Sequence, residues 1–164
     1  MKQIGLLSDT HGWWDERYMK YFSSCDEIWH AGDIGSLDFA LKFEKLKPFR
    51  AVYGNIDGHE IRVSYPEFLR FRCEDVDVLM THIGGYPGKY NPRVKNILDI
   101  KPPQLFICGH SHILKVIYDR KYNCLHINPG AAGIYGFHQT RTLIRFAIDK
   151  KEIKDLEVIE LKEE

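Results

Sequence analysis

Short apolar runs recur along the 164-residue chain, and five of them end directly in Asp, Asn or His, most with glycine close by. The five segments read LLSDTHG, WHAGDIG, VYGNIDG, LMTHIGG and ICGHSHI. A short apolar run bounded by turn residues is typical of a buried β-strand. Because α/β sheets bind ligands at the carboxyl ends of their strands, we expect the polar residues after these runs to converge at one edge.

The order of the remaining patterns predicts an α/β fold. In the first half, strands at 3–8, 27–32 and 49–54 alternate with helices at 15–24 and 37–46, the second capped by Ser36. This order favours a mainly parallel sheet. A hairpin at 67–74 and 76–82, a helix at 91–100 and a strand at 104–109 follow, and four strands at 115–121, 123–128, 141–149 and 152–161 complete the chain. We therefore expect one domain, residues 1–164, with two sheets packed face to face and helices outside.

Composition excludes several classes of protein. Lys and Arg together number 23, and so do Asp and Glu, which argues against a general binder of nucleic-acid polymers. No apolar run approaches the roughly 18–20 residues of a membrane span, and the N-terminus reaches polar residues by Ser8, too soon for a signal peptide. The four scattered cysteines suit reduced, buried thiols. A cytoplasmic protein with no membrane partner is expected, and its oligomeric state stays open.

The polar residues at the strand ends have the chemistry of a metal site. Carboxylates, an amide oxygen and imidazoles together suit Mn, Fe or Zn. Seven such donors are too many for one ion, but they suit two ions about 3.5–4 Å apart that share a bridging carboxylate. Each element alone is weak evidence, because Gly-Asp and Gly-Asn are common in turns. The combination of five carries the inference, whereas His30 and His126 fall inside strands and are interpreted as packing residues.

The motifs SDTHG, GDIG, GNID, THIGG and GHSH, in this order, resemble those of the calcineurin-like metallophosphoesterase superfamily. The short length and the INPGAAG segment resemble its small, YfcE-like phosphodiesterase branch. The resemblance implies a four-layer α/β/β/α sandwich with two mixed sheets. It also implies two divalent ions, most often Mn, with Fe, Zn or Ni as alternatives. One ion would be held by Asp9, His11, Asp33 and His112, and the other by Asp33, Asn55, His82 and His110, with Asp33 bridging.

The chain departs from the family pattern at two places that bear on catalysis. Ala131 stands where a serine is common, and Asn55-Ile56-Asp57 replaces a motif whose His can protonate the leaving group. The general acid is therefore open, with Asp57 and His59 as candidates.

Three residues are candidates for contacts with substrate: Trp13, His138 and Arg141. Trp13 or its neighbour Trp14 would stack on a nucleobase, or both would pack under the first helix. Arg141 would pair with a phosphate or form an ordinary salt bridge. The loop at 84–90 would border the cleft or act as a linker.

The predicted function is that of a metal-dependent phosphodiesterase that hydrolyses a small phosphodiester, such as a nucleotide, with a hydroxide activated by two ions. Two alternatives stay open. One is a phosphomonoesterase of the same fold, and the other is a protein-binding scaffold like the retromer subunit that shares the fold. A nuclease is disfavoured, because a long strand needs a basic track that the neutral composition does not provide.

Overall fold

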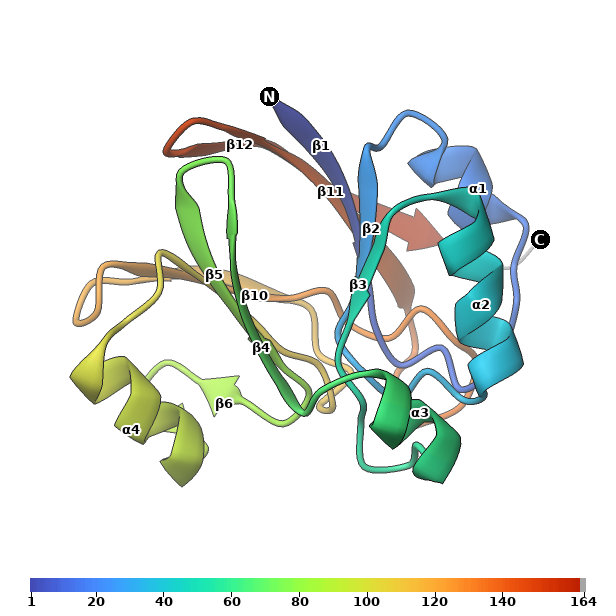
Figure 1. Cartoon of the computed structure of the whole chain (residues 1–164), viewed down its shortest axis with the longest axis horizontal. Coiled ribbons are helices and arrows are strands. Elements are labelled where there is room, and N and C mark those ends of the chain that lie inside the picture. The colour runs from blue at the N-terminus through green and yellow to red at the C-terminus, as the bar shows by residue number, and fades with distance from the viewer. Residues whose placement is uncertain (163–164) are drawn as a thin grey trace.

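The structure, a computed structural model, describes residues 1–162 and contains two five-stranded sheets (Figure 1). The first sheet has the order β12-β11-β1-β2-β3. Its strands are β1 (Lys2–Leu7), β2 (Glu27–His30), β3 (Phe49–Ala51), β11 (Arg141–Asp149) and β12 (Glu152–Leu161). The second has the order β4-β5-β8-β10-β9. Its strands are β4 (Phe68–Cys73), β5 (Val76–Thr81), β8 (Leu105–Ile107), β9 (Lys115–Asp119) and β10 (Cys124–Asn128). The last two residues of the expected 1–164 domain lie outside the described range.

Both sheets are mixed, which confirms the predicted fold class. In the first, β1, β2 and β3 are parallel while β11 and β12 run antiparallel to their neighbours. In the second, β5, β8 and β10 are parallel while β4 and β9 are antiparallel. The helices are α1 (Arg17–Phe22), α2 (Leu37–Leu46), α3 (His59–Ser64) and α4 (Pro92–Ile100).

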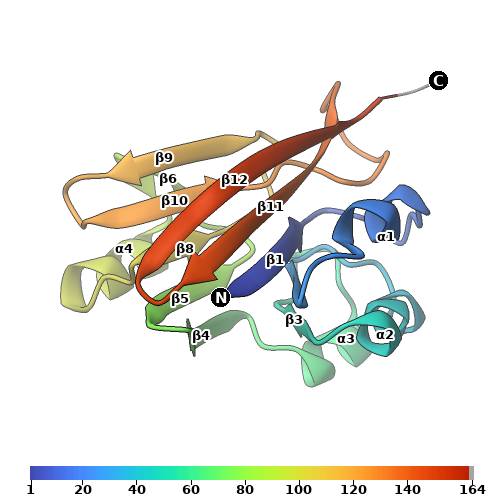
Figure 2. The ribbon, with the colours of Figure 1, turned by 90° about the horizontal axis from the view of Figure 1, so that it is seen from above.

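Three apolar cores separate four layers, and Figure 2 shows the sheets stacked between helices. The middle core lies between the two sheets. There Trp29 of β2 is fully buried, with its ring centroid 4.9 Å from that of Phe71 and 5.7 Å from that of Phe146. Burial of one large apolar side chain stabilises the fold by about 1.5–3 kcal/mol, so this core fixes how one sheet sits on the other.

Local sequence explains where the two longer helices begin. The Ser36 hydroxyl accepts a hydrogen bond from the Phe39 amide and caps α2, as predicted. Pro92 occupies the first turn of α4, where its missing N–H costs nothing, and the Asn91 side chain accepts from the Arg93 amide. No helix within residues 1–162 is long and apolar enough to cross a membrane.

Two short elements were not expected from the sequence. Helix α3 has six residues of which only Ile61 is buried, so its sequence shows no apolar face, and its cap residue Gly58 offers no side chain. The 84–90 segment folds into a hairpin of two-residue strands, β6 (Gly85–Tyr86) and β7 (Lys89–Tyr90). Positive φ angles at Gly85 and Gly88 allow its tight turns, and strands this short leave no alternation to read.

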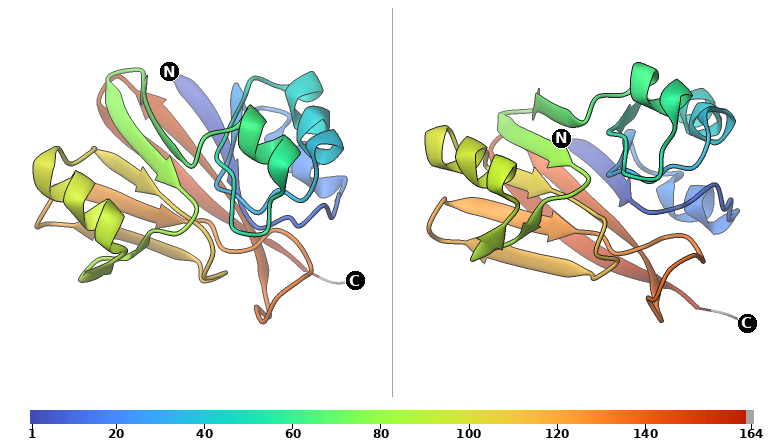
Figure 3. Two further views of the ribbon diagram at one scale, coloured as in Figure 1. Left: turned by 60° about the horizontal axis from the view of Figure 1, so that its bottom comes forward. Right: turned by 90° about the horizontal axis from the view of Figure 1, so that it is seen from below.

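The parallel strands of both sheets direct their carboxyl ends toward the same edge of the molecule. Figure 3 looks onto this edge in its view from below. Backbone hydrogen bonds join the loops there. The Asp9 amide donates to the Gly32 carbonyl within the first sheet, and the Gly109 amide donates to the His82 carbonyl within the second. Two further hydrogen bonds cross between the sheets, from the His110 amide to Asp9 Oδ2 and from His82 Nδ1 to the Ala31 carbonyl, so the edge is a seam where loops from the two sheets meet.

Candidate metal centre

The seam gathers six of the seven predicted ligands into two groups. The first group is Asp9, His11 and His112, and the second is Asp33, His82 and His110. Within each group, one potential ligand atom from every residue lies within 4.8 Å of the others. Each group takes residues from both sheets, because Asp9, His11 and Asp33 follow strands of the first sheet whereas the other three follow β5 and β8 of the second.

Two buried imidazole nitrogens in these groups have no hydrogen-bond partner within the described residues, namely Nε2 of His11 and Nε2 of His82. His82 Nε2 lies 3.2 Å from Asp33 Oδ2 and 3.7 Å from Asp9 Oδ1. His11 Nε2 lies 3.5 Å and 3.9 Å from the same two oxygens. An unpaired buried polar atom is costly, and two of them aimed at two carboxylates are consistent with a site for a cation.

The carboxylates are fixed through their other oxygens. Asp9 Oδ2 accepts hydrogen bonds from the Ser8 hydroxyl at 2.6 Å and from the His110 amide at 3.2 Å. Asp33 Oδ1 accepts from the Ile56 amide at 3.1 Å. Each carboxylate therefore keeps one oxygen free to face the imidazoles.

Neighbouring acceptors set which ring nitrogen of the histidines faces the carboxylates. His82 donates from Nδ1 to the Ala31 carbonyl at 2.7 Å, which leaves Nε2 with its lone pair. His112 directs Nδ1 toward Nδ1 of His138 at 3.1 Å, and its Nε2 lies 3.1 Å from Asp9 Oδ1. Oriented imidazoles of this kind are typical of metal ligands.

Asn55, the seventh predicted ligand, lies beside the second group. Its Oδ1 is 3.0 Å from His110 Nδ1, and both side chains are exposed at the surface of the seam. An amide oxygen here adds a neutral donor to a group that already holds one carboxylate, which suits a divalent cation.

The backbone at the seam adopts conformations that most residues avoid. Nine non-glycine residues within 1–162 have positive φ, and five of them are predicted ligands with φ between 48° and 71°. These five are Asp9, His11, Asp33, His110 and His112. Left-handed backbone at non-glycine residues costs about 1–3 kcal/mol each and clusters at functional sites, so the loops are shaped for placing side chains rather than for stability.

Glycines next to the ligands allow close approach. A Cβ at Gly54 would overlap the Asp33 carboxylate, and a Cβ at Gly32, whose φ is +103°, would lie 2.6 Å from His82 Nδ1. These two positions explain why glycine stands immediately before Asn55 and Asp33 in the sequence.

The electrostatics of the two groups favour bound positive charge. Burial tends to raise the pKa of Asp9, but the His112 ring 3.1 Å from its Oδ1, the charge of His82 and the hydrogen bond from Ser8 outweigh it and hold the pKa below its usual value. Burial tends to lower the pKa of His82, yet the Asp33 carboxylate 3.2 Å from Nε2 and the nearby Asp9 charge raise it. The pKa of His110 is lowered. The partial loss of solvent around its ring is the main cause, and the charge of His82 is the second.

The donor set fits a pair of divalent cations. Two carboxylate oxygens, four imidazoles and one amide oxygen converge, and two of the imidazole nitrogens are otherwise unsatisfied. Hard oxygen and borderline nitrogen donors are the combination that Mn, Fe and Zn accept.

The two candidates for the general acid lie in different surroundings. Asp57 is buried, and its carboxylate accepts hydrogen bonds from the amides of Ile34, Gly35 and Gly54. This arrangement ties two ligand loops together and argues for a structural role instead of proton donation. His59 is exposed at the start of α3, where it lines a shallow hollow with Gly35 and residues nearby.

The three expected substrate contacts also differ in placement. Arg141 is buried, where its guanidinium donates to the Ala132 carbonyl at 2.8 Å and to Asp15 at 3.1 Å, which argues for holding the 128–141 loop. His138 contacts His112, as described above, and donates from Nε2 to the Gly133 carbonyl at 2.7 Å. Trp13 is exposed after His11.

Trp14 packs in the helical core, with its ring centroid 5.2 Å from that of Phe43. Of the two tryptophans, Trp14 therefore packs under the helices, whereas Trp13 is exposed.

Sequence reasoning missed residues that support the ligand loops. Asn128 donates from Nδ2 to the Gly109 carbonyl and to the Ser111 hydroxyl, so it braces the loop that carries His110 and His112. The amide of Gly133 donates to the Asp9 carbonyl. Asn128 and Gly133 both belong to the INPGAAG segment. In the sequence this segment indicated a resemblance to a family, but it did not indicate that these residues support the ligand loops.

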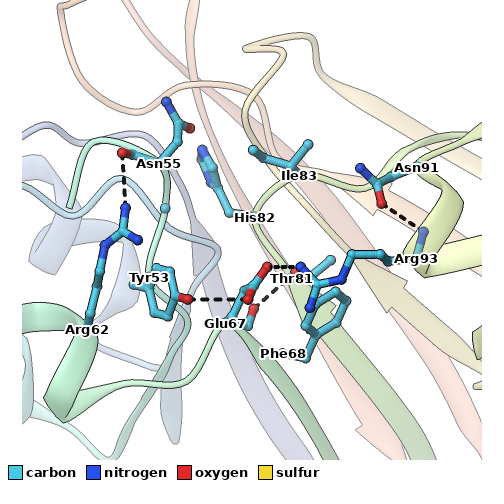
Figure 4. Close-up of a pocket in the computed structure, with 11 residues that line it drawn as sticks. Tyr53, Asn55, Arg62, Glu67, Phe68, Thr81, His82, Ile83, Asn91 and Arg93 are labelled. Atoms are coloured by element: carbon cyan, nitrogen blue, oxygen red, sulfur yellow. Dashed lines mark hydrogen bonds and ion pairs between the residues drawn. The ribbon is translucent and has the colours of Figure 1, made fainter. Parts of the chain in front are cut away.

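Two hollows adjoin the second group of ligands. One of about 320 Å³ is lined by Asn55 and His82 together with Tyr53, Arg62, Glu67 and Arg93 (Figure 4). The other, of about 640 Å³, is lined by His110 and by residues of the β6–β7 hairpin. Ile83 and Asn91 border both. The centre thus lies beside two spaces that ligand groups would enter from different sides.

Comparison with known proteins identifies relatives of this arrangement. A "Probable metallophosphoesterase" of Methanothermobacter thermautotrophicus is 30% identical over 114 residues, which span 66% of this chain and 66% of that relative. A structure described as a novel archaeal phosphodiesterase is 24% identical with a TM-score of 0.70, over 97% of this chain and 99% of that one. Vps29 of Entamoeba histolytica complexed with Zn²⁺ is 13% identical with a TM-score of 0.72, over 97% and 98%.

The model of the calcineurin-like phosphoesterase superfamily domain matches residues 1–151, which include all seven predicted ligands. The match extends over both sheets and both groups of the metal centre. The chain therefore belongs to the calcineurin-like phosphoesterase superfamily.

Proposed function

We propose that the protein is a metal-dependent phosphodiesterase that hydrolyses a small phosphodiester at a centre of two divalent cations, with Mn²⁺ as the preferred ion. The ions would be held by Asp9, His11, Asp33, Asn55, His82, His110 and His112, with Asp33 between them. The observation that carries the proposal is the pair of unpartnered nitrogens of His11 and His82, both aimed at the same two carboxylates. Family membership supports phosphate-ester chemistry.

Two bound cations supply Lewis acidity for the phosphate oxygens and lower the pKa of a coordinated water. The chain's contribution is preorganisation. Ser8 and the Ile56 amide hold the outer carboxylate oxygens of Asp9 and Asp33, so these groups need not reorganise during the reaction. The Ala31 carbonyl fixes the His82 ring in the same way.

Charge balance also supports an anionic substrate. The two groups supply only two carboxylates, whereas the remaining donors are neutral imidazoles and one amide. Two divalent cations would therefore leave a net positive centre, which attracts the anionic oxygens of a phosphate ester.

Metal analysis and paired hydrolysis assays test the proposal. Protein purified and loaded with Mn²⁺ should hold about two ions per chain and should hydrolyse bis(4-nitrophenyl) phosphate faster than 4-nitrophenyl phosphate. Asp33→Asn, which keeps the shape of the side chain, should abolish both the second ion and turnover.

The other outcomes separate the alternatives. A strong preference for the monoester would replace the diesterase proposal with a phosphomonoesterase at the same centre. Loading with two ions and no hydrolysis of either ester, together with a stoichiometric protein partner, would favour the scaffold alternative. Failure to bind any divalent ion would overturn the proposal as a whole.

A further inference from the structure

The larger hollow beside the metal centre has the dimensions of a small-molecule site. Its volume of about 640 Å³ falls within the range of such sites, and His110 forms part of its wall. It lies between the β6–β7 hairpin and the outer face of the second sheet, the side on which α4 also packs (Figure 1). Tyr86 of β6, Tyr90 of β7, Lys115 of β9 and His126 of β10 come from four different strands.

The side chains that line the hollow, all within residues 1–162, include two cations, Lys89 and Lys115, and no carboxylate. In the part of the chain that the structure describes, no carboxylate oxygen forms an ion pair with Lys115; its Nζ lies over the Tyr86 ring, 4.4 Å from the centroid. A lysine held on an aromatic face beside a reaction centre, with no acidic partner, is placed to bind an anionic group of a ligand.

The smaller hollow differs in this respect, as Figure 4 shows. Its Arg93 forms an ion pair with Glu67, and its Arg62 donates to the backbone carbonyls of Asp57 and Asn55. Arg62 lies over the Tyr53 ring, 4.7 Å from its centroid, and its two acceptors are neutral. The smaller hollow, however, contains the Glu67 carboxylate, whereas, among the described residues, no carboxylate lines the larger one. The larger hollow is therefore the better site for an anion.

The walls of the larger hollow also suit a planar aromatic group. Tyr86, Tyr90, Ile83 and Ile113 supply apolar and aromatic surface. His126 contributes a fully buried ring whose Nδ1 has no hydrogen-bond partner within residues 1–162. Burial lowers its pKa to about 4, so the ring is neutral near pH 7 and adds no charge to the wall.

We infer that this hollow binds a nucleotide group, meaning a heteroaromatic base that carries a phosphate beyond the one hydrolysed, with Lys115 pairing with that additional phosphate. The inference rests on the proposed function, in that the nucleotide group would be one substituent of the phosphodiester held at the metal centre. The other substituent would then point toward the smaller hollow, on the far side of Ile83.

Binding measured without metal tests this inference separately from catalysis. Metal-free protein in EDTA is titrated with adenosine 5′-diphosphate, with adenosine and with pyrophosphate, and backbone amide resonances are followed by NMR. The diphosphate should shift the amides of Gly84, Gly109 and Ser111 in a saturable way. Adenosine and pyrophosphate should each bind at least about tenfold more weakly, because each contacts only part of the site.

A matched pair of variants identifies the cation. Lys115→Met should weaken binding of adenosine 5′-diphosphate about tenfold. Lys121→Met is the control, because Lys121 also lies over a tyrosine ring, that of Tyr122 at 5.3 Å, but outside this hollow. The control should change affinity less than about twofold. Equal effects of the two substitutions, shifts confined to other regions, or no binding would each overturn the inference.

The same preparations distinguish failure of the inference from failure of the proposed function. If Mn²⁺-loaded protein hydrolyses an aryl phosphodiester but metal-free protein does not bind the diphosphate, the nucleotide site is wrong and the phosphodiesterase stands. If the diphosphate binds in a Lys115-dependent way but no ester is hydrolysed, the site stands and the phosphodiesterase is wrong.

Discussion

His112 and His138 face each other through their Nδ1 atoms at 3.1 Å, and His138 is itself anchored through Nε2 on the Gly133 carbonyl at 2.7 Å. A carbonyl only accepts, so Nε2 of His138 donates to it, and in the neutral ring Nδ1 is left as an acceptor. His112 then donates from Nδ1 and keeps the lone pair of Nε2 on the side of Asp9. A residue expected to contact substrate is thus placed to orient a predicted metal ligand.

The first prediction concerns this pair. His138→Ala should weaken binding of Mn²⁺ or Co²⁺ about 10- to 100-fold at the group that contains His112, because nothing then fixes the ring. His138→Gln keeps an acceptor and should recover most of the affinity. Isothermal titration and the visible spectrum of the Co²⁺ form measure the effect. Gln139→Ala, in the same loop, is the control. Unchanged affinity in His138→Ala would refute the orienting role.

The second prediction concerns an exposed ligand. His110→Ala should reduce turnover of an aryl phosphodiester by at least about a thousandfold while changing the free energy of unfolding of the metal-free protein by less than about 1 kcal/mol. The ring is exposed and adds little to core packing. Steady-state kinetics and urea unfolding provide the measurements, with Tyr118→Ala, an exposed ring on β9, as the control. Retained turnover would remove His110 from the metal site.

The third prediction separates the two roles considered for Asp57. Since its carboxylate accepts from three backbone amides, Asp57→Asn should lower the free energy of unfolding by about 1–3 kcal/mol. With saturating Mn²⁺, kcat should fall only a few-fold and its dependence on pH should keep the same shape. Exposed Asp75→Asn serves as the control for stability. If kcat instead fell strongly and its pH profile lost the decrease at high pH, while stability stayed unchanged, Asp57 would be identified as the general acid.

The fourth prediction concerns the pH dependence of stability. His30 is fully buried. Its Nδ1 accepts a hydrogen bond from the Gly32 amide, and its Nε2 lies 2.9 Å from the Thr10 hydroxyl oxygen. Burial lowers its pKa to about 3. Its folded pKa lies below the unfolded value near 6.5, so the unfolded chain binds one more proton between these limits. The free energy of unfolding should therefore fall as the pH drops below about 6.5.

This contribution is roughly 1.4 kcal/mol per pH unit for one proton. His30→Asn removes the titrating ring, so its free energy of unfolding should fall less steeply between pH 6 and 4, whatever its stability at pH 7. Urea unfolding of the metal-free proteins at several pH values measures both slopes. Parallel slopes for the two proteins would show that His30 does not titrate on unfolding.

Local patterns predicted most elements of the fold. The α2 range and its Ser36 cap, the β4–β5 hairpin and the strands from β8 to β12 all have signals within a few residues of sequence. The sequence did not predict helix α3, because α3 buries only Ile61 and so shows no apolar face, whereas the equally short α1 buries Tyr18 and Phe22, four residues apart. It did not predict the β6–β7 hairpin either, because two-residue strands are too short to alternate. The conformation of both elements depends on neighbours distant in the chain, such as the Asp57 carboxylate that joins the Gly54 and Gly35 loops.

The candidate site was predicted in part. Asp, Asn and His residues that directly follow predicted strands indicated which side chains converge, since the carboxyl ends of parallel strands lie at the same edge of a sheet. What each remaining polar residue does was not predictable, because partners such as Arg141 with Asp15, or His138 with His112, lie 126 and 26 residues apart. Only packing of the two sheets brings such pairs together, and no local spacing encodes it.

Both ligand groups straddle the seam, since each combines side chains from loops of the two sheets. A cation bound by either group would therefore link the first sheet to the second. Conversely, a slip of the apolar interface around Trp29 would pull the donors of both groups out of alignment at once. Substitutions in the core between the sheets should therefore impair activity as well as stability, although they lie far from the ligand side chains.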